Sequence, residues 1–259
     1  MTPGSVVIYG DFNSPWSYLA ARRAERLAAD GLQVDWRAVE HDPMRPSPDR
    51  APSGRFDGLR PELDRVVSTL LPGEHLPHSL AGFVPYTKAA VAGYAEAYGA
   101  GVAPSVCQLL FEAFWINAID LGDARLVRTL LVDAVRSGSS RSEALREWGY
   151  AVDVTGAPIT TVAYGLISQW KAEWTEAGKE VVPVLMVDGG RPIFGRAAVR
   201  WLGYELVTRG LNLEPDPPPL LARRRARSDL PDLSWTSQHG STWNRAYQDA
   251  HKTDMLKAG

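Results

Sequence analysis

The first 40 residues of the chain show a strand pattern, a helical pattern and a second strand pattern. Residues 6–9 are apolar and mostly β-branched, which predicts a buried strand. Apolar residues recur at helical spacing through 16–29, and Gly31 is a suitable helix stop. Residues 32–39 alternate strictly between apolar and polar, which predicts a second strand. Elements of these lengths predict a βαβ unit with a right-handed crossover and parallel strands.

The pattern then becomes helical for more than a hundred residues. Several prolines within 41–48 interrupt any regular element. Ser140 and Glu143 form a capping box, which predicts a short helix at that point. The hydrophobic periodicity predicts the other helices over 62–71, 87–98, 105–117, 123–136 and 159–177.

Strand patterns return after the helical block. Residues 181–187 form an apolar run, and 191–194 form a shorter one. Between them lies Asp-Gly-Gly at 188–190, which suits the positive φ angles of a tight hairpin. Residues 197–206 show a closing helical pattern. The order βαβ, helices, ββα predicts an α/β fold that leaves one sheet, builds an all-helical insertion and returns to the sheet.

These patterns divide the chain into three parts. Residues 1–45 and 178–209 are expected to form the α/β domain, and 46–177 the helical insertion. Residues 210–259 are expected to be a C-terminal extension, because prolines at 215–219 exclude a helix or a central strand. The isolated tryptophans of this extension favour packing on the chain or on a neighbouring subunit over a free tail.

Composition and charge exclude several classes of function. The chain has 259 residues, of which 45% are hydrophobic and 22% charged, and a formal net charge of −2. This balance is typical of globular proteins and gives no reason to expect nucleic acid or a membrane as partner. The basic run at 223–227 is better interpreted as a solvated segment. Without a signal-peptide pattern or a membrane-spanning apolar run, we expect a cytoplasmic location.

Metal and phosphate sites are not predicted. The only cysteine, Cys107, lies in an apolar helical pattern and is interpreted as a small buried hydrophobe rather than a nucleophile. The five histidines show no metal-binding spacing, and a proline lies between His75 and His78. Gly189 and Gly190 indicate a turn rather than a phosphate-binding loop.

The first strand-to-helix junction, DFNSPWSYLA at 11–20, carries the candidate chemistry. Ser14 and Pro15 are typical of a helix N-cap and first helical position, a pairing that needs no ligand. Unpaired N–H groups and the positive end of the helix dipole would also stabilise an anion there. A serine hydroxyl does not ionise in this field, but it can donate a hydrogen bond to a ligand thiolate. Ser14 is the better placed candidate for that role, and Ser17 the weaker.

A proline within the late apolar run provides a second candidate feature. Pro183 would remove a ladder hydrogen bond from a central strand, so it indicates an edge, a strand start or a cis peptide bond. In the predicted order of elements, Val182-Pro183 would face the N-terminus of the first helix. The backbone groups of Val182 could then pair with an extended, thiol-bearing ligand.

These motifs resemble the DsbA-like thioredoxin-fold superfamily. The resemblance covers about residues 5–209 in the order of elements. It lies in DFNSPWSYLA, in EVVPVLMVDGGRPIFG at 180–195, and in FWINAIDLGD at 114–123 within the helical insertion. The most similar branch contains kappa-class glutathione transferases, 2-hydroxychromene-2-carboxylate isomerases and FrnE-type disulfide isomerases. The resemblance implies a thioredoxin-like fold with an all-helical insertion, and it makes a homodimer a reasonable expectation.

The resemblance also implies a chemistry. In FrnE-type and DsbA proteins the turn is Cys-Pro-x-Cys, whereas Ser14 and Ser17 stand at both cysteine positions here, so dithiol–disulfide exchange is excluded at this turn. In the transferases and isomerases the turn is Ser-Pro-Tyr-Ser, and its first serine is implied to bond the glutathione sulfur. By this resemblance Ser14, with Ser17 beside it, is catalytic, and Val182-Pro183 binds the peptide backbone of the thiol.

The expected cofactor is a low-molecular-weight thiol, and the expected substrate is an apolar electrophile. Asn13, Pro15 and Trp16, which occupies the tyrosine position, complete the expected cofactor site. The glutathione families tend to carry an acidic residue where Arg196 stands here. Because no carboxylate stands there, glutathione, another low-molecular-weight thiol and no thiol all stay open. Arg196 could pair with a ligand carboxylate, although a solvated arginine at a helix start is the favoured interpretation. The alternative is a redox-inactive relative that binds a peptide or metabolite, or acts by assembly.

Overall fold

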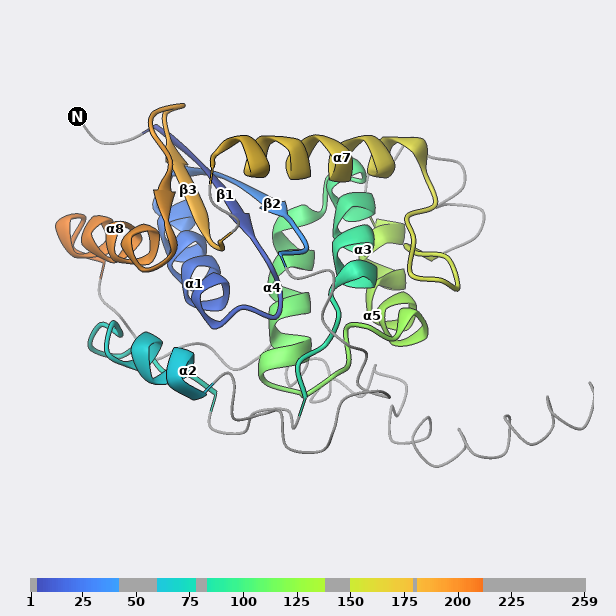
Figure 1. Ribbon diagram of the computed structural model, residues 1–259, viewed down its shortest axis with the longest axis horizontal. Helices are drawn as coiled ribbons and strands as arrows, with labels where there is room; N and C mark the ends of the chain where they lie inside the picture. The colour runs from blue at the N-terminus through green and yellow to red at the C-terminus, as the bar shows by residue number, and fades with distance from the viewer. Residues whose placement is uncertain (1–3, 42–59, 78–82, 138–149, 179–180, 212–259) are drawn as a thin grey trace, which may run out of the picture. The chain divides into compact units, whose positions relative to one another are not determined.

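The computed structural model describes residues 4–41, 60–77, 83–137, 150–178 and 181–211 (Figure 1). The chain divides into two units, 1–217 and 218–259, and all described residues lie in the first. The short helix predicted at Ser140 and Glu143 lies outside the described residues. So does the predicted C-terminal extension, apart from residues 210 and 211.

The described strands form one four-stranded sheet of order β2-β1-β3-β4. Strand β1 (Ser5–Gly10) and strand β2 (Gln33–Ala38) are parallel and are connected by helix α1 (Pro15–Ala29), which confirms the predicted βαβ unit. Strand β3 (Val184–Val187) runs antiparallel to β1, and β4 (Ile193–Phe194) runs antiparallel to β3. This topology is the α/β arrangement that the order of elements predicted, and it is the thioredoxin-like fold that the resemblance implied.

The segment between β2 and β3 is helical wherever it is described as regular structure. The described helices of the insertion are α2 (Arg60–Val67), α3 (Lys88–Gly99), α4 (Ala103–Trp115), α5 (Ala124–Ser137) and α7 (Thr161–Glu176). Of these, α3, α4 and α7 contact β2. Helix α8 (Gly195–Thr208) follows β4 and packs beside α1 (Figure 1).

A buried arginine fixes α1 against α8 and against the segment that follows α2. The Arg23 side chain is 1% exposed and donates two hydrogen bonds to the Glu74 carboxylate, at 2.8 and 2.6 Å. It also donates to the carbonyl oxygens of Val199 and Thr69, at 2.6 and 2.8 Å. Gly203 leaves the space for this guanidinium, because a Cβ there would lie 2.7 Å from Arg23 Nη1. Four of the five guanidinium N–H groups thus donate to protein oxygens, which offsets the cost of burying the charge.

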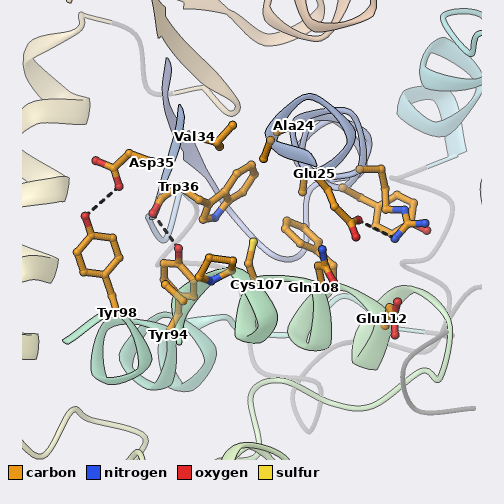
Figure 2. Close-up of a pocket in the computed structure, with 17 residues that line it drawn as sticks. Ala24, Glu25, Val34, Asp35, Trp36, Tyr94, Tyr98, Cys107, Gln108 and Glu112 are labelled. Carbon is orange, nitrogen blue, oxygen red and sulfur yellow. Dashed lines mark hydrogen bonds and ion pairs between the residues drawn. The ribbon is translucent and has the colours of Figure 1, made fainter. Parts of the chain in front are cut away.

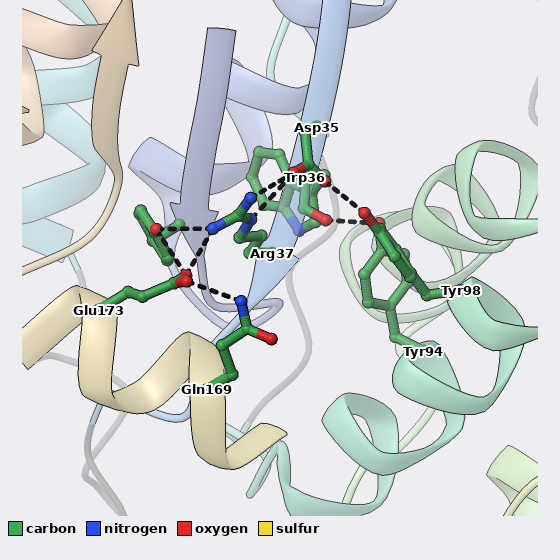
Figure 3. Close-up of polar contacts among 8 residues, drawn as sticks. Asp35, Trp36, Arg37, Tyr94, Tyr98, Gln169 and Glu173 are labelled. Carbon is green, nitrogen blue, oxygen red and sulfur yellow. Dashed lines mark hydrogen bonds and ion pairs between the residues drawn. The ribbon is translucent and has the colours of Figure 1, made fainter. Parts of the chain in front are cut away.

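A polar network fastens the insertion to the sheet (Figure 3). Arg37 on β2 donates to Asp35 on the same strand, at 2.7 Å, and to Glu173 on α7. The Tyr9 hydroxyl on β1 donates to Glu173 Oε2 at 2.9 Å and accepts from Arg37 at 3.0 Å. On the other side of β2, Tyr98 on α3 donates to Asp35 Oδ1 at 3.0 Å. The network joins β1, β2, α3 and α7 through charge-assisted hydrogen bonds.

The Tyr9 phenol gives this network a measurable pH dependence. Burial and the hydrogen bond to Glu173 raise the pKa of Tyr9 to about 12, against about 10 in an unfolded chain. The folded state thus holds the phenol proton more tightly, so its stabilising contribution is complete below pH 10 and is lost between about pH 10 and 12. We expect Tyr9→Phe to lose stability less steeply than wild type in urea unfolding across this window. Equal slopes for the two proteins would contradict the assignment.

Candidate active site

The turn between β1 and α1, residues 11–14, is buried along its whole length, and so are the first residues of α1 up to residue 20. Ser14 is 4% exposed and is the N-cap of α1, with Pro15 in the first helical turn, which confirms that part of the sequence interpretation. Its Oγ accepts a hydrogen bond from the Ser17 backbone N–H at 3.3 Å. Among the described residues, none accepts the hydrogen of the Ser14 hydroxyl. Ser14 therefore caps the helix with its oxygen and keeps a donor at the positive end of the helix dipole.

Ser17 has a structural partner. Its Oγ accepts a hydrogen bond from the Asp11 backbone N–H at 3.2 Å, and the side chain is fully buried. The Asp11 carboxylate is buried as well and turns toward the end of β2, where Oδ2 accepts from the backbone N–H of His41 at 3.0 Å. The same oxygen lies 2.7 Å from His41 Nδ1. Asp11 and His41 thus connect the turn to the neighbouring strand.

Sequence reasoning missed the Asp11–His41 pair. One signal was available, because parallel strands end at the same edge of a sheet and each residue follows one of the two parallel strands. Asp11 comes directly after β1, and His41 comes three residues after β2.

The helical insertion contacts the turn through two hydrogen bonds. Trp115, at the end of α4, donates from its indole N–H to the carbonyl oxygen of Phe12 at 2.9 Å. The Asn13 side-chain amide donates to the carbonyl oxygen of Pro85 at 3.1 Å. Trp16, the second residue of α1, is buried, with an exposed fraction of 8%.

Three buried oxygens beside the turn lack hydrogen-bond partners among the described residues. They are Asp11 Oδ1, Asn13 Oδ1 and Thr87 Oγ1. Thr87 is the N-cap of α3 and makes no side-chain capping bond. A buried acceptor without a donor costs about 1–3 kcal/mol, so a bound molecule or an ordered water would be stabilised at each of these atoms.

The Val182–Pro183 peptide bond is cis, one of the alternatives that the sequence left open. Strand β3 begins directly after it, at Val184, so Pro183 stands at the start of the strand and removes no ladder bond. The register pairs Val184 with Tyr9, near the C-terminal end of β1. Pro183 therefore lies at the end of the sheet from which the 11–14 turn leaves.

Arg196 comes to the same end of the sheet. Phe194 on β4 pairs with Val184, and α8 begins at the next residue, whose backbone N–H donates to the carbonyl oxygen of Pro183 at 2.7 Å. Arg196, in the first turn of α8, is exposed. The fold thus gathers Ser14, Val182-Pro183 and Arg196 at one sheet end, where the N-termini of α1 and α8 both supply partial positive charge.

A cavity among the described residues lies elsewhere, between α1, β2, α3 and α4 (Figure 2). Its volume is about 450 Å³, and Tyr18, one helical turn after Ser14, is among its walls, whereas Ser14 is not. Cys107 also lines it, and burial, with a smaller effect of the Glu25 charge, raises the pKa of this thiol well above its usual range. Cys107 is therefore a neutral, buried thiol, in agreement with the sequence interpretation.

In the described part of the chain, no cluster of His, Cys, Asp and Glu side chains could hold a metal ion. Every helix in those same ranges is too short or too polar to cross a lipid bilayer.

Comparison with known proteins establishes the family. The DSBA-like thioredoxin domain matches residues 5–170, which is more than half of the sequence. The chain therefore belongs to the DSBA-like thioredoxin domain family. No curated protein matches the chain.

Solved structures of several proteins share the fold. A 2-hydroxychromene-2-carboxylate isomerase is 20% identical, with a TM-score of 0.54, over 87% of this chain and 99% of its own. A probable DsbA oxidoreductase from Streptomyces coelicolor is 20% identical, with a TM-score of 0.52, over 83% and 93%. The cytosolic disulfide reductase DsbM from Pseudomonas aeruginosa is 13% identical, with a TM-score of 0.51, over 80% and 100%. At these identities the likeness concerns the fold alone.

The capping role of Ser14 can be measured separately from any ligand. Ser14→Ala removes the acceptor of the Ser17 N–H and is expected to lower the free energy of unfolding by about 1 kcal/mol, whereas Ser14→Gly should cost only a few tenths. Urea denaturation of the three proteins measures both values. An Ala variant as stable as wild type would show that the Ser14 oxygen does not cap α1.

Proposed function

We propose that this chain is a thiol-dependent isomerase or transferase that binds a low-molecular-weight thiol at the first strand-to-helix turn. Ser14 donates a hydrogen bond to the thiolate, and the positive end of α1 stabilises its charge. The substrate is an apolar electrophile. The observation that carries the proposal is the Ser14 hydroxyl, which caps a helix with its oxygen and keeps its hydrogen for an acceptor.

The chemistry of the turn supports this function over that of a dithiol oxidoreductase. The sequence contains one cysteine, Cys107, and it lies on α4 rather than at the turn. A dithiol–disulfide cycle uses two thiols, one of which attacks as a thiolate. The hydroxyls of Ser14 and Ser17 cannot act as the attacking thiolate. A hydroxyl donor at a helix N-terminus can still stabilise a negatively charged sulfur that belongs to a ligand. The isomerase named above shares the fold, which makes this chemistry reasonable without establishing it.

The residues at the sheet end suit the parts of such a thiol. Val182, before the cis bond, would offer backbone groups to an extended ligand, as a strand does to its neighbour. Arg196 would pair with a ligand carboxylate, and its exposure leaves the guanidinium accessible. The unpaired oxygens of Asp11 and Asn13 are acceptors for amide or ammonium donors.

In the proposed reaction the bound thiol supplies the sulfur nucleophile. Ser14 holds the sulfur in its anionic form by donating a hydrogen bond that is stronger to a thiolate than to a thiol. The buried setting of the turn excludes water, so the hydroxyl and the helix dipole act at low dielectric. The serine contributes electrostatic stabilisation and forms no covalent bond with the substrate.

The first test measures the pKa of a bound thiol. Thiolate absorbance near 240 nm is titrated for a panel of biological thiols bound to wild type, Ser14→Ala and Ser14→Gly, with binding measured by calorimetry. Loss of the hydroxyl is expected to raise the bound thiol pKa by about one to two pH units, the effect of one hydrogen bond to a charged group. Ser17→Ala, which keeps the Ser14 hydroxyl, is the control. The proposal fails if no thiol binds wild type, or if the pKa is the same without the hydroxyl.

The second test concerns the carboxylate partner. Arg196→Ala should weaken the binding of carboxylate-bearing thiols about tenfold, since a charge-assisted pair is lost, and leave uncharged thiols unaffected. Arg200→Ala removes an equally exposed arginine one turn further along α8 and is the matched control. Equal affinities of wild type and Arg196→Ala for every thiol would remove Arg196 from the site.

A further inference from the structure

The cavity between α1, β2, α3 and α4 has no part in the chemistry proposed at Ser14. Its volume of about 450 Å³ falls within the range of small-molecule sites. The space exists because small residues of α1, Ala21, Ala24 and Ala28, form one wall, and Ala28 at the mouth is exposed. Protein interiors are otherwise close-packed, so a hollow of this size among apolar side chains favours an occupant.

The inner surface of the cavity is aromatic. Trp36 on β2 and Phe111 on α4 meet edge to face, with ring centroids 5.4 Å apart, and Tyr94 on α3 completes this wall. The indole N–H of Trp36 is buried and has no hydrogen-bond partner among the described residues. A buried indole usually donates to some acceptor, so this N–H is an unused donor on a residue that lines the cavity.

The charges that line the cavity are mostly negative. Three carboxylates contribute to its walls, those of Glu25, Asp35 and Glu112, against one guanidinium, that of Arg22. Arg22 donates to Glu25 at 3.2 Å. Arg37, which is outside the cavity lining, donates to Asp35 at 2.7 Å, so both cations are already paired with carboxylates. An anionic ligand would therefore meet the Glu112 carboxylate and no unused positive charge, whereas a neutral or cationic ligand needs none.

We propose that this cavity is a second binding site, which takes a small aromatic compound that is neutral or positively charged. Tyr18 and Phe111 line the cavity, with ring centroids 6.0 Å apart, whereas no residue from 11 to 17 is among the lining residues. The site is therefore distinct from the thiol site and does not depend on thiol binding.

Access to this cavity can be measured with a residue that the chain already contains. Cys107 is the only cysteine of the sequence, it lines the cavity, and its sulfur is directed from α4 toward Trp36 (Figure 2). We would treat the native protein with three methanethiosulfonates, one neutral and aromatic (benzyl), one cationic (trimethylammonium-ethyl) and one anionic (sulfonatoethyl). Intact-protein mass spectrometry measures the rate at which each reagent modifies Cys107. The same measurement on the urea-unfolded chain gives the intrinsic reaction rate of each reagent.

The ratio of native to unfolded rate is expected to be about tenfold higher for the benzyl and cationic reagents than for the anionic one. All three react with the same thiolate, so the high pKa of Cys107 cancels from the comparison. Glu25→Gln should narrow the difference between the charged reagents. If none of the three modifies native Cys107 faster than global unfolding allows, or if the anionic reagent is the fastest, the proposal is wrong.

Occupancy is tested with N-phenyl-1-naphthylamine, a neutral aromatic probe that fluoresces in apolar sites. Wild type, Ser14→Gly and Cys107→Ala should bind it, whereas the benzyl adduct of Cys107 and Ala24→Leu, which both fill the cavity, should lose at least about tenfold in affinity. The benzyl adduct forms on folded protein, so it remains decisive should Ala24→Leu fail to fold. Unchanged probe affinity in the adduct would overturn the proposal. Thiol binding at the Ser14 turn should be the same in wild type, Cys107→Ala, the benzyl adduct and Ala24→Leu.

Discussion

Strand β1 ends inside the molecule, so each backbone and side-chain polar group of the turn that follows must find a partner without water. The partners come from three directions. The turn supplies two of its own hydroxyls, at Ser14 and Ser17. The helical insertion supplies the indole of Trp115, and the segment after β2 supplies His41. Sheet, insertion and first helix are thereby positioned by hydrogen bonds that meet at one short stretch of chain.

This constraint also explains how the turn works without cysteines. A thiol at position 14 would be a weaker acceptor for the helix N–H groups than a hydroxyl is, whereas serine is among the preferred N-caps. The field of the helix end acts on whatever lies in front of it, whether the sulfur belongs to the protein or to a ligand. With serines at positions 14 and 17 the turn therefore holds no pair of thiols, while the field of the helix end is unchanged.

Much of the fold followed from local patterns. The strict alternation of 32–39 and the helical spacing of 123–136 depend on residues adjacent in sequence, and the structure has β2 and α5 at those places. The ends of elements were predicted less accurately. The apolar run that predicted a strand begins at residue 181, whereas β3 begins at Val184, after the proline. The tight turn that precedes β4 has positive φ at Asp188 and Gly189, as Asp-Gly-Gly predicted.

The site was only partly accessible to the same reasoning. The position of Ser14 at a helix cap could be inferred, because capping is a local property. The pair of Asp11 and His41 joins residues 30 positions apart, and the unpaired oxygen of Thr87 lies further still along the chain. The cavity was not predicted, because it depends on which face of α1 its alanines present to α4. Such features arise from tertiary packing, which periodicity does not record.

The buried guanidinium of Arg23 has a consequence for the size of the molecules that the sheet end can accept. It bonds the backbone of α8 from within α1, and Gly203 admits it only because no side chain stands there. The two helices are thus held at one spacing by a buried hydrogen bond. For the thiol site proposed above, differences in substrate size would then be accommodated at the opposite wall, where the insertion meets the turn through single hydrogen bonds at Phe12 and Asn13. Substitutions that change substrate specificity would then be expected in the inserted helices, while the sheet and helices α1 and α8 keep a constant geometry.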